Sequence, residues 1–291
     1  MPTEKDKNKI VEDIADEVAK QLLGKSTTKK EKPPEPVTWK SLKKDFVKTL
    51  EPLTHNRRML NVFGDFCLVA CYALSNQRAN YRQDREDKYL QVINSYKTYE
   101  ERVAFAHALA KVVMAYGIVA DGDQRDFLGE CYMEGEMANK NSGEFFTPYD
   151  IQRLMAQLTF DADEIKRKEF ITVMEPACGS GGMILAFANV AFAAGVDVPN
   201  KICFYAIDVN PLCCQMAYIN LACAGLPAVI YHGDSLSNEM WDVFLTPAYL
   251  NHCWPHKLCC PQSAKGNPKD FAEWFKDIAK QAAGKMLKPL D

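Results

Sequence analysis

The sequence has little net charge, no long apolar run and no apolar segment at its N-terminus. Its formal net charge of −3 provides no broad basic field for non-specific nucleic-acid binding, although a local basic face would suffice for binding DNA. Because no run approaches the roughly 18 apolar residues that cross a bilayer, we expect no membrane-spanning segment. The first ten residues, MPTEKDKNKI, are charged, so we expect no secretion signal.

The cysteines do not resemble a disulfide framework. There are 11 of them, an odd number, and no secretion signal accompanies them. This favours reduced thiols and a cytoplasmic protein. The hydrophobic fraction of 47% and charged fraction of 25% are ordinary for globular proteins, and 291 residues suffice for one large or two ordinary domains.

The hydrophobic pattern changes character along the chain. A short amphipathic helix over 8–24 and a Lys-, Thr- and Pro-rich linker fill 1–38. The next part is helical, with predicted helices at 40–51, 56–78, 85–95, 98–120, 124–138 and 148–159. Strands are then predicted at 170–174, 201–207, 228–232 and 242–246, with helices 182–194 and 211–224 between the first three. The alternation predicts an α/β fold with a parallel sheet. We expect three parts: a helix and linker (1–38), a helical domain (39–142) and a sheet domain (143–291).

A glycine-rich turn, EPACGSGGM (175–183), lies between the first strand and its helix. Glycines let the backbone turn tightly and approach a ligand at the carboxyl end of a strand. No Gly-Lys-Ser/Thr follows, and Ile184 replaces the third glycine of a dinucleotide fingerprint. A purely structural turn is possible, but the position between strand and helix favours a ligand-binding loop.

Acidic residues follow the next two strands. Asp208 is where α/β nucleotide-binding folds place an acid on ribose hydroxyls, although Asp208, Asn210 and Pro211 also suit the start of a helix. Asp234 closes the third strand and could accept an amino group, although Gly-Asp is also common in turns. Upstream, Thr147 and Pro148 are predicted as N-cap and first residue of a helix, whose N-terminus suits a carboxylate.

Taken in order, these motifs resemble a known family. The series G-x-F-x-T-P, E-P-A-C-G-S-G-G, strand-Asp-x-Asn-Pro and Gly-Asp-Ser-Leu is similar to adenine-N6 DNA methyltransferases of the type I restriction M-subunit kind, nearest to small phage- and plasmid-borne members. The resemblance covers roughly 120 to 250. It implies that the sheet after the helical N-terminal domain is Rossmann-like. The family's sheet continues with three more strands, but no clear strand pattern follows Tyr249, so we expect a sheet abbreviated after the fourth strand. The resemblance also implies S-adenosylmethionine as cofactor, DNA as partner and a possible specificity or other partner subunit.

The resemblance assigns roles to individual residues. Thr147 and Pro148 would hold the methionine end of the cofactor, with Phe146 packing beside it. Asp208 would take the ribose hydroxyls, and Asp234 the adenine amino group. The remaining cofactor-binding residues implied in this way are Glu175, Ala177, Gly179, Ser180, Gly181, Val209 and Ser235.

The expected catalytic tetrapeptide departs from the family pattern. Where the family has Asn or Asp followed by Pro-Pro-aromatic, this chain has Thr246-Pro247-Ala248-Tyr249. The resemblance implies that Thr246, Pro247 and Tyr249 act on a flipped adenine, whereas a plain exit from a strand is equally open. The leading hypothesis is therefore a DNA adenine-N6 methyltransferase. The alternative is a catalytically inactive subunit that binds S-adenosylmethionine or DNA and modulates restriction or a partner methyltransferase.

A cluster of potential metal ligands follows the tetrapeptide. His252, Cys253, His256 and Cys259 include a C-x-x-H-x-x-C spacing. So many ligands within a few residues are crowded for one tetrahedral ion, because zinc sites usually draw on two separated pairs. We therefore expect packing and no metal.

Overall fold

The computed structural model describes residues 37–76, 81–119, 122–135 and 146–259. The predicted helix over 8–24 and all but the last two residues of its linker lie outside these residues, as does a helical pattern in the sequence at 270–287. The chain forms two compact units, one containing residues 37–76 and 82–119, and the other containing 122–135 and 146–259. Each is described by itself.

The first unit is helical, as the sequence predicts. Its elements are α2 (Trp39–Leu50), the 3-10 helix η1 (Glu51–Asn56), α3 (Met59–Ser75), α4 (Gln83–Asn94) and α5 (Tyr99–Ile118). Phe46 of α2 packs edge-on against Phe66 of α3, with ring centroids 5.0 Å apart. Most of α3 is buried, because its residues are apolar on nearly every side.

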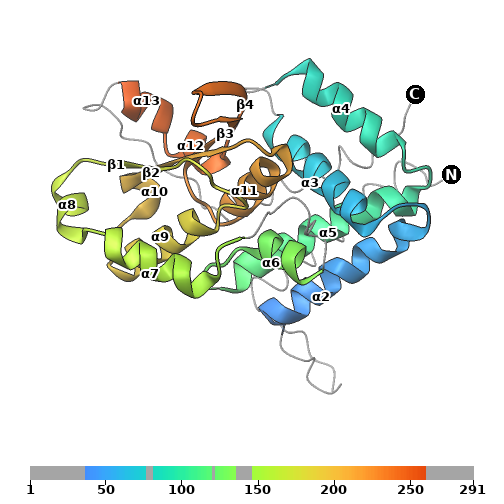
Figure 1. Ribbon diagram of the computed structural model, residues 1–291, viewed down its shortest axis with the longest axis horizontal. Coiled ribbons are helices and arrows are strands. Elements are labelled where there is room, and N and C mark those ends of the chain that lie inside the picture. The colour runs from blue at the N-terminus through green and yellow to red at the C-terminus, as the bar shows by residue number, and fades with distance from the viewer. Residues whose placement is uncertain (1–36, 77–80, 120–121, 136–145, 260–291) are drawn as a thin grey trace, which may run out of the picture. The chain divides into compact units, whose positions relative to one another are not determined.

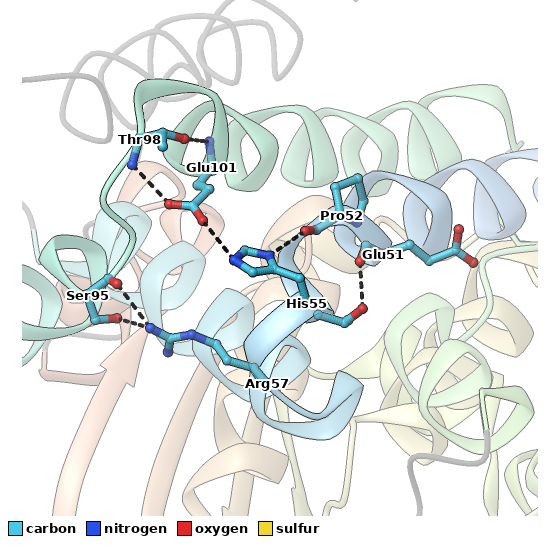
Figure 2. A network of polar contacts seen from close by, with 8 residues as sticks. Glu51, Pro52, His55, Arg57, Ser95, Thr98 and Glu101 are labelled. Carbon is cyan, nitrogen blue, oxygen red and sulfur yellow. Dashed lines mark hydrogen bonds and ion pairs between the residues drawn. The ribbon is translucent and has the colours of Figure 1, made fainter.

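Polar contacts join η1 to the turn between α4 and α5 (Figure 2). The Arg57 guanidinium donates to the Ser95 carbonyl at 3.1 Å and lies 4.2 Å above the Tyr96 ring. His55 lies 3.9 Å from the Glu101 carboxylate, which also accepts from the Thr98 backbone in a capping box. These contacts tie the turn between α4 and α5 to η1.

No single helix in the described ranges combines the length and apolar composition needed to cross a membrane. Only the pair Trp39–Asn56 and Met59–Ser75 passes that test jointly, and a bend of 116° separates its two parts.

The second unit contains the four-stranded sheet (Figure 1). Its strands are β1 (Ile171–Glu175), β2 (Ile202–Asp208), β3 (Ala228–Asp234) and β4 (Glu239–Leu245), side by side in sequence order. The helices are α6 (Phe127–Glu134), α7 (Tyr149–Thr159), α8 (Ala162–Arg167), α9 (Gly182–Ala193), α10 (Val198–Lys201), α11 (Pro211–Cys223), α12 (Pro247–Asn251) and α13 (Trp254–Cys259). The four predicted strands and the helices between the first three are confirmed, with small shifts at their ends.

The two faces of the sheet are covered by different helices. Phe204 of β2 packs against Phe187 of α9, and Phe244 of β4 against Tyr218 of α11. On the opposite face, Cys203 and Val229 form a core with Tyr249 of α12 and Trp254 of α13. The alternation along each strand thus places one apolar set on each face.

The fourth strand corrects the prediction of a wholly parallel sheet. β1, β2 and β3 are parallel, whereas β4 is antiparallel to β3. Only residues 235–238 separate the two strands. A parallel connection needs about a dozen residues or more, so a link this short permits only a hairpin.

Candidate cofactor-binding site

The glycine loop follows β1 and is shaped by left-handed backbone. Gly179 has φ +52° and Gly181 has φ +91°, conformations that side chains rarely adopt. The loop ends where α9 begins at Gly182, and Gly181 faces α11, where an added Cβ would be in van der Waals contact with Ala217. The loop therefore exists in this form because glycine occupies these two positions.

Asp208, at the end of β2, holds the glycine loop to the next turn. One carboxylate oxygen accepts from the Gly179 amide at 2.8 Å, and the other from the Asn210 amide at 2.9 Å. Asn210 rather than Asp208 caps α11, because its side chain accepts from Leu212. Asp208 stays half-exposed. A carboxylate can accept about four hydrogen bonds, so Asp208 retains capacity for a ligand's hydroxyl groups.

Two further carboxylates lie at the same edge of the sheet. Since β1, β2 and β3 are parallel, Glu175, Asp208 and Asp234 all end their strands at this edge. Burial raises the pKa of Glu175. The backbone amides of Leu236 and Ser237 donate to Asp234 and lower its pKa.

The segment before α7 lies against the loop. Phe146 packs over Gly179, where an added Cβ would be 3.1 Å from the ring. Gln152 of α7 donates to the Thr147 carbonyl at 2.7 Å, and an added Cβ on Gly182 would be 2.4 Å from the same side chain. Pro148, not Thr147, occupies the cap position of α7, so the prediction of Thr147 as N-cap is wrong by one residue: the Pro148 carbonyl accepts the first helical amides.

Val209 completes the described surface beside the glycine loop. Its side chain is 58% exposed, and its carbonyl lies 3.2 Å from the His232 ring nitrogen. The structure thus places the residues predicted to bind cofactor around the glycine loop and at the carboxyl ends of the parallel strands. They are Phe146, Thr147, Glu175, Ala177, Gly179, Ser180, Gly181, Asp208 and Val209, with Pro148 at the cap of α7 and Asp234 and Ser235 at the end of β3.

The predicted catalytic tetrapeptide lies at the other edge of the sheet. Because β4 is antiparallel, it ends where β3 begins. Thr246 is fully buried there: its hydroxyl accepts from the Ala228 amide and donates to the Leu226 carbonyl, each at 2.8 Å. Pro247 and Tyr249 are buried too, with Tyr249 in the core beside Trp254. The structure does not bring these three residues to the glycine loop.

The cluster after the tetrapeptide is engaged in packing. His252 lies 3.0 Å from the Asn200 side chain, and the Trp254 indole donates to the Pro199 carbonyl at 2.9 Å. Among the side chains that the structure describes, no three His, Cys, Asp or Glu residues are placed to hold a metal ion together.

One buried residue has no role in the sequence interpretation. Asp126, the N-cap of α6, bonds to Ser180 in the glycine loop and to Asn220 of α11. Gln124 likewise exchanges hydrogen bonds with Asn189 of α9. These bonds explain why 122–135 belongs to the compact unit with the sheet, whereas the sequence places it in the helical domain. An Asp before an apolar run signals a helix cap, which does not reveal its distant partners.

The compact unit that contains the sheet is similar to known proteins. Residues 123–258 match the family model described as N-6 DNA Methylase. The type I restriction enzyme MpnII methylase subunit of Mycoplasma pneumoniae is 28% identical over 128 residues, which cover 43% of this chain and 22% of that protein. The MjaIX methylase subunit of Methanocaldococcus jannaschii is 27% identical over 143 residues, 46% of this chain and 24% of that protein.

A solved structure is also similar, the type I restriction-modification system methyltransferase subunit from Streptococcus thermophilus. It has 18% sequence identity and a TM-score of 0.32, over 83% of this chain and 60% of that one. The matched part of this chain spans less than a quarter of the length of each of the two curated relatives.

Proposed function

We propose that the protein is an S-adenosylmethionine-dependent DNA methyltransferase acting on adenine N6, a proposal that starts from the match of residues 123–258 to the family model described as N-6 DNA Methylase. The observation that carries the proposal is the joint placement of the glycine loop and Asp208. Their direct bond, from the Gly179 amide to the carboxylate, forms one surface from two strand ends.

The chemistry of this surface fits the cofactor. S-adenosylmethionine supplies a methyl group on a positively charged sulfur, and it also carries an ammonium group and two ribose hydroxyls. Glu175, Asp208 and Asp234 offer carboxylate oxygens for such donors and charges at one edge of the sheet. The left-handed turn at Gly179 lets a ligand approach the backbone closely, which a Cβ at this position would prevent.

The residues around the loop take separate binding roles in this proposal. Asp208 accepts from the ribose hydroxyls, and the exposed Val209 side chain packs on the adenine ring. Asp234 accepts from the adenine amino group, with Ser235 beside it. Phe146, Thr147 and Pro148 line the methionine end, supported by the packing of Phe146 on Gly179.

Methyl transfer requires a second set of groups, which align the target nitrogen and accept its hydrogens. The hydroxyl of the chain's candidate, Thr246, bonds to three backbone groups, those of Ala228, Leu226 and Tyr249, and lies at the opposite edge of the sheet. Cofactor binding and transfer are therefore separate questions. The similarity to methylase subunits supports transfer over the alternative of a subunit that only binds cofactor.

The named relatives are methylase subunits of type I restriction enzymes. We extend the proposal to DNA as substrate, to action beside a partner subunit and to a cytoplasmic location, which the odd number of cysteines favours.

Calorimetric titration with S-adenosylmethionine, followed by incorporation of labelled methyl groups into unmethylated DNA, tests the proposal. We expect saturable binding with one site and transfer to adenine. Failure to bind S-adenosylmethionine would reject the proposal. Binding without transfer to any DNA, alone or with a partner methylase, would leave the cofactor-binding subunit instead.

A further inference from the structure

The side chain of Asp126 joins three segments that are distant in sequence. One carboxylate oxygen accepts from the Gly129 amide at 2.8 Å and from the Asn220 side chain at 2.7 Å. The other accepts from the Ser180 hydroxyl. Asn220 also donates to the Ser180 carbonyl at 3.0 Å. Helix α6, the glycine loop and helix α11 therefore meet at one carboxylate.

These contacts exceed what a helix cap requires. Asp161 caps α8 in the same unit with one exposed oxygen, which accepts from the Asp163 and Glu164 amides. Asp126 instead is buried, and its second oxygen is committed to the glycine loop. Burial of a carboxylate is costly unless hydrogen bonds compensate for the lost water. The donors from the loop and from α11 provide that compensation.

The space around this carboxylate is closed. A Cβ added at Gly129 would lie 2.0 Å from the Asp126 carboxylate and 2.4 Å from the Ser180 hydroxyl oxygen. Burial raises the pKa of Asp126 to about 6, so the carboxylate is mostly ionised at neutral pH and able to accept from all three donors. The hydroxyl and the carbonyl of Ser180 are thus both held by hydrogen bonds from or to buried side chains.

We propose that Asp126 is a positioning residue for the glycine loop, and this inference rests on the proposed binding of S-adenosylmethionine. Ser180 lies between Gly179 and Gly181, whose left-handed backbone gives the loop its shape. Asp126 holds the Ser180 hydroxyl while Asn220 holds the Ser180 carbonyl. The Gly179 amide is thereby kept in line with Asp208 before any ligand arrives. Asp126 itself touches no ligand in this scheme.

Hydrogen–deuterium exchange in the ligand-free protein tests the inference without reference to the cofactor. Asp126→Ala is expected to accelerate exchange of the amides of residues 178–182 by about tenfold, since the loop loses its anchor. Asp161→Ala, which removes a cap of the same type, should accelerate exchange only around α8. Asp126→Asn keeps an acceptor oxygen for Gly129 and Asn220 and places its NH2 group toward Ser180, whose hydroxyl oxygen can accept, so it should restore most of the protection.

Ser180→Ala provides a second route if Asp126→Ala fails to fold. It removes the donor and leaves the cap of α6 intact, and it should loosen the same loop amides. Unchanged loop exchange in Ser180→Ala, or in an Asp126→Ala variant that folds, would overturn the inference.

Binding of S-adenosylmethionine, measured well below each variant's melting temperature, separates positioning from simple stability. Asp126→Ala should raise the dissociation constant on the order of tenfold, Asp126→Asn less, and Asp161→Ala not at all. Equal affinity of wild type and Asp126→Ala would also overturn the inference. Absence of binding by the wild type would reject the proposed function, whereas the exchange data would still decide whether Asp126 anchors the loop.

Discussion

The two edges of the sheet each carry a polar side chain that bonds to the backbone, but the two side chains differ in exposure and in remaining hydrogen-bonding capacity. At the carboxyl edge of the parallel strands, Asp208 is half-exposed and bonds to two backbone amides with acceptor capacity left over. At the other edge, Thr246 is fully buried, and its hydroxyl donates to one backbone carbonyl and accepts from two backbone amides. A polar side chain with spare capacity at a surface can recognise a ligand, whereas a saturated buried one stabilises the fold. The second edge thus stabilises the fold, and the first is the edge at which we propose that the cofactor binds.

The largest expected effect is on stability at the second edge. Trp254→Ala removes a fully buried indole that packs edge-on against Phe170 at 5.4 Å and bonds to the Pro199 carbonyl. We expect a loss of about 4 kcal/mol in the free energy of unfolding, measured by urea denaturation. Leu250 lies in α12 and is 38% exposed, so Leu250→Ala should lower the free energy of unfolding far less. Equal losses in the two variants would show that Trp254 is not part of this core.

The glycine-loop edge should instead make stability depend on pH. Burial raises the pKa of Asp126 from 3.8 to about 6. Between these two pH values the folded protein therefore keeps a proton that the unfolded chain has already released. The stabilisation is fully present below about pH 4 and is lost as pH rises through about 6, a change of about 3 kcal/mol. Asp126→Asn has no such titration. The difference between the wild-type and variant unfolding free energies should therefore change over this range, and a constant difference would contradict the assigned burial.

Cofactor affinity should distinguish the edges directly. Asp208→Ala removes the acceptor of the Gly179 amide and the proposed partner of the ribose hydroxyls, so affinity for S-adenosylmethionine should fall about a hundredfold. Tyr249→Ala should leave the affinity unchanged and lower the stability, because its ring lies in the core with Trp254. Calorimetry and denaturation on both variants give the two readings. A similar loss of affinity in both would mean that the two edges are coupled.

The smallest expected effect on stability comes from removing the Thr246 hydroxyl. Thr246→Ala leaves the buried Ala228 amide without its partner, at an expected cost of about 2 kcal/mol of unfolding free energy. Thr246→Ser keeps the hydroxyl and should cost about 1 kcal/mol for the lost methyl group. Neither variant should alter the affinity for S-adenosylmethionine. A Thr246→Ala variant of wild-type stability with impaired methyl transfer would instead return Thr246 to the catalytic role suggested by the sequence.

Local patterns were enough to predict the strands, most helices and the residues at the carboxyl edge. Asp208 and the glycines follow strands directly, and the carboxyl ends of parallel strands necessarily share an edge. Asn210 at a helix start was similarly visible, because capping depends on residues a few positions apart.

The direction of β4 and the role of Asp126 required the folded chain. A strand's pattern is the same whichever way it runs. The sequence therefore allowed Thr246–Tyr249 to be expected at the cofactor site, whereas the β3–β4 hairpin places them at the other edge of the sheet. Asp126 meets Ser180 and Asn220 across 54 and 94 residues of sequence. Contacts of that separation depend on how the sheet and its helices pack, and no spacing along the chain encodes them.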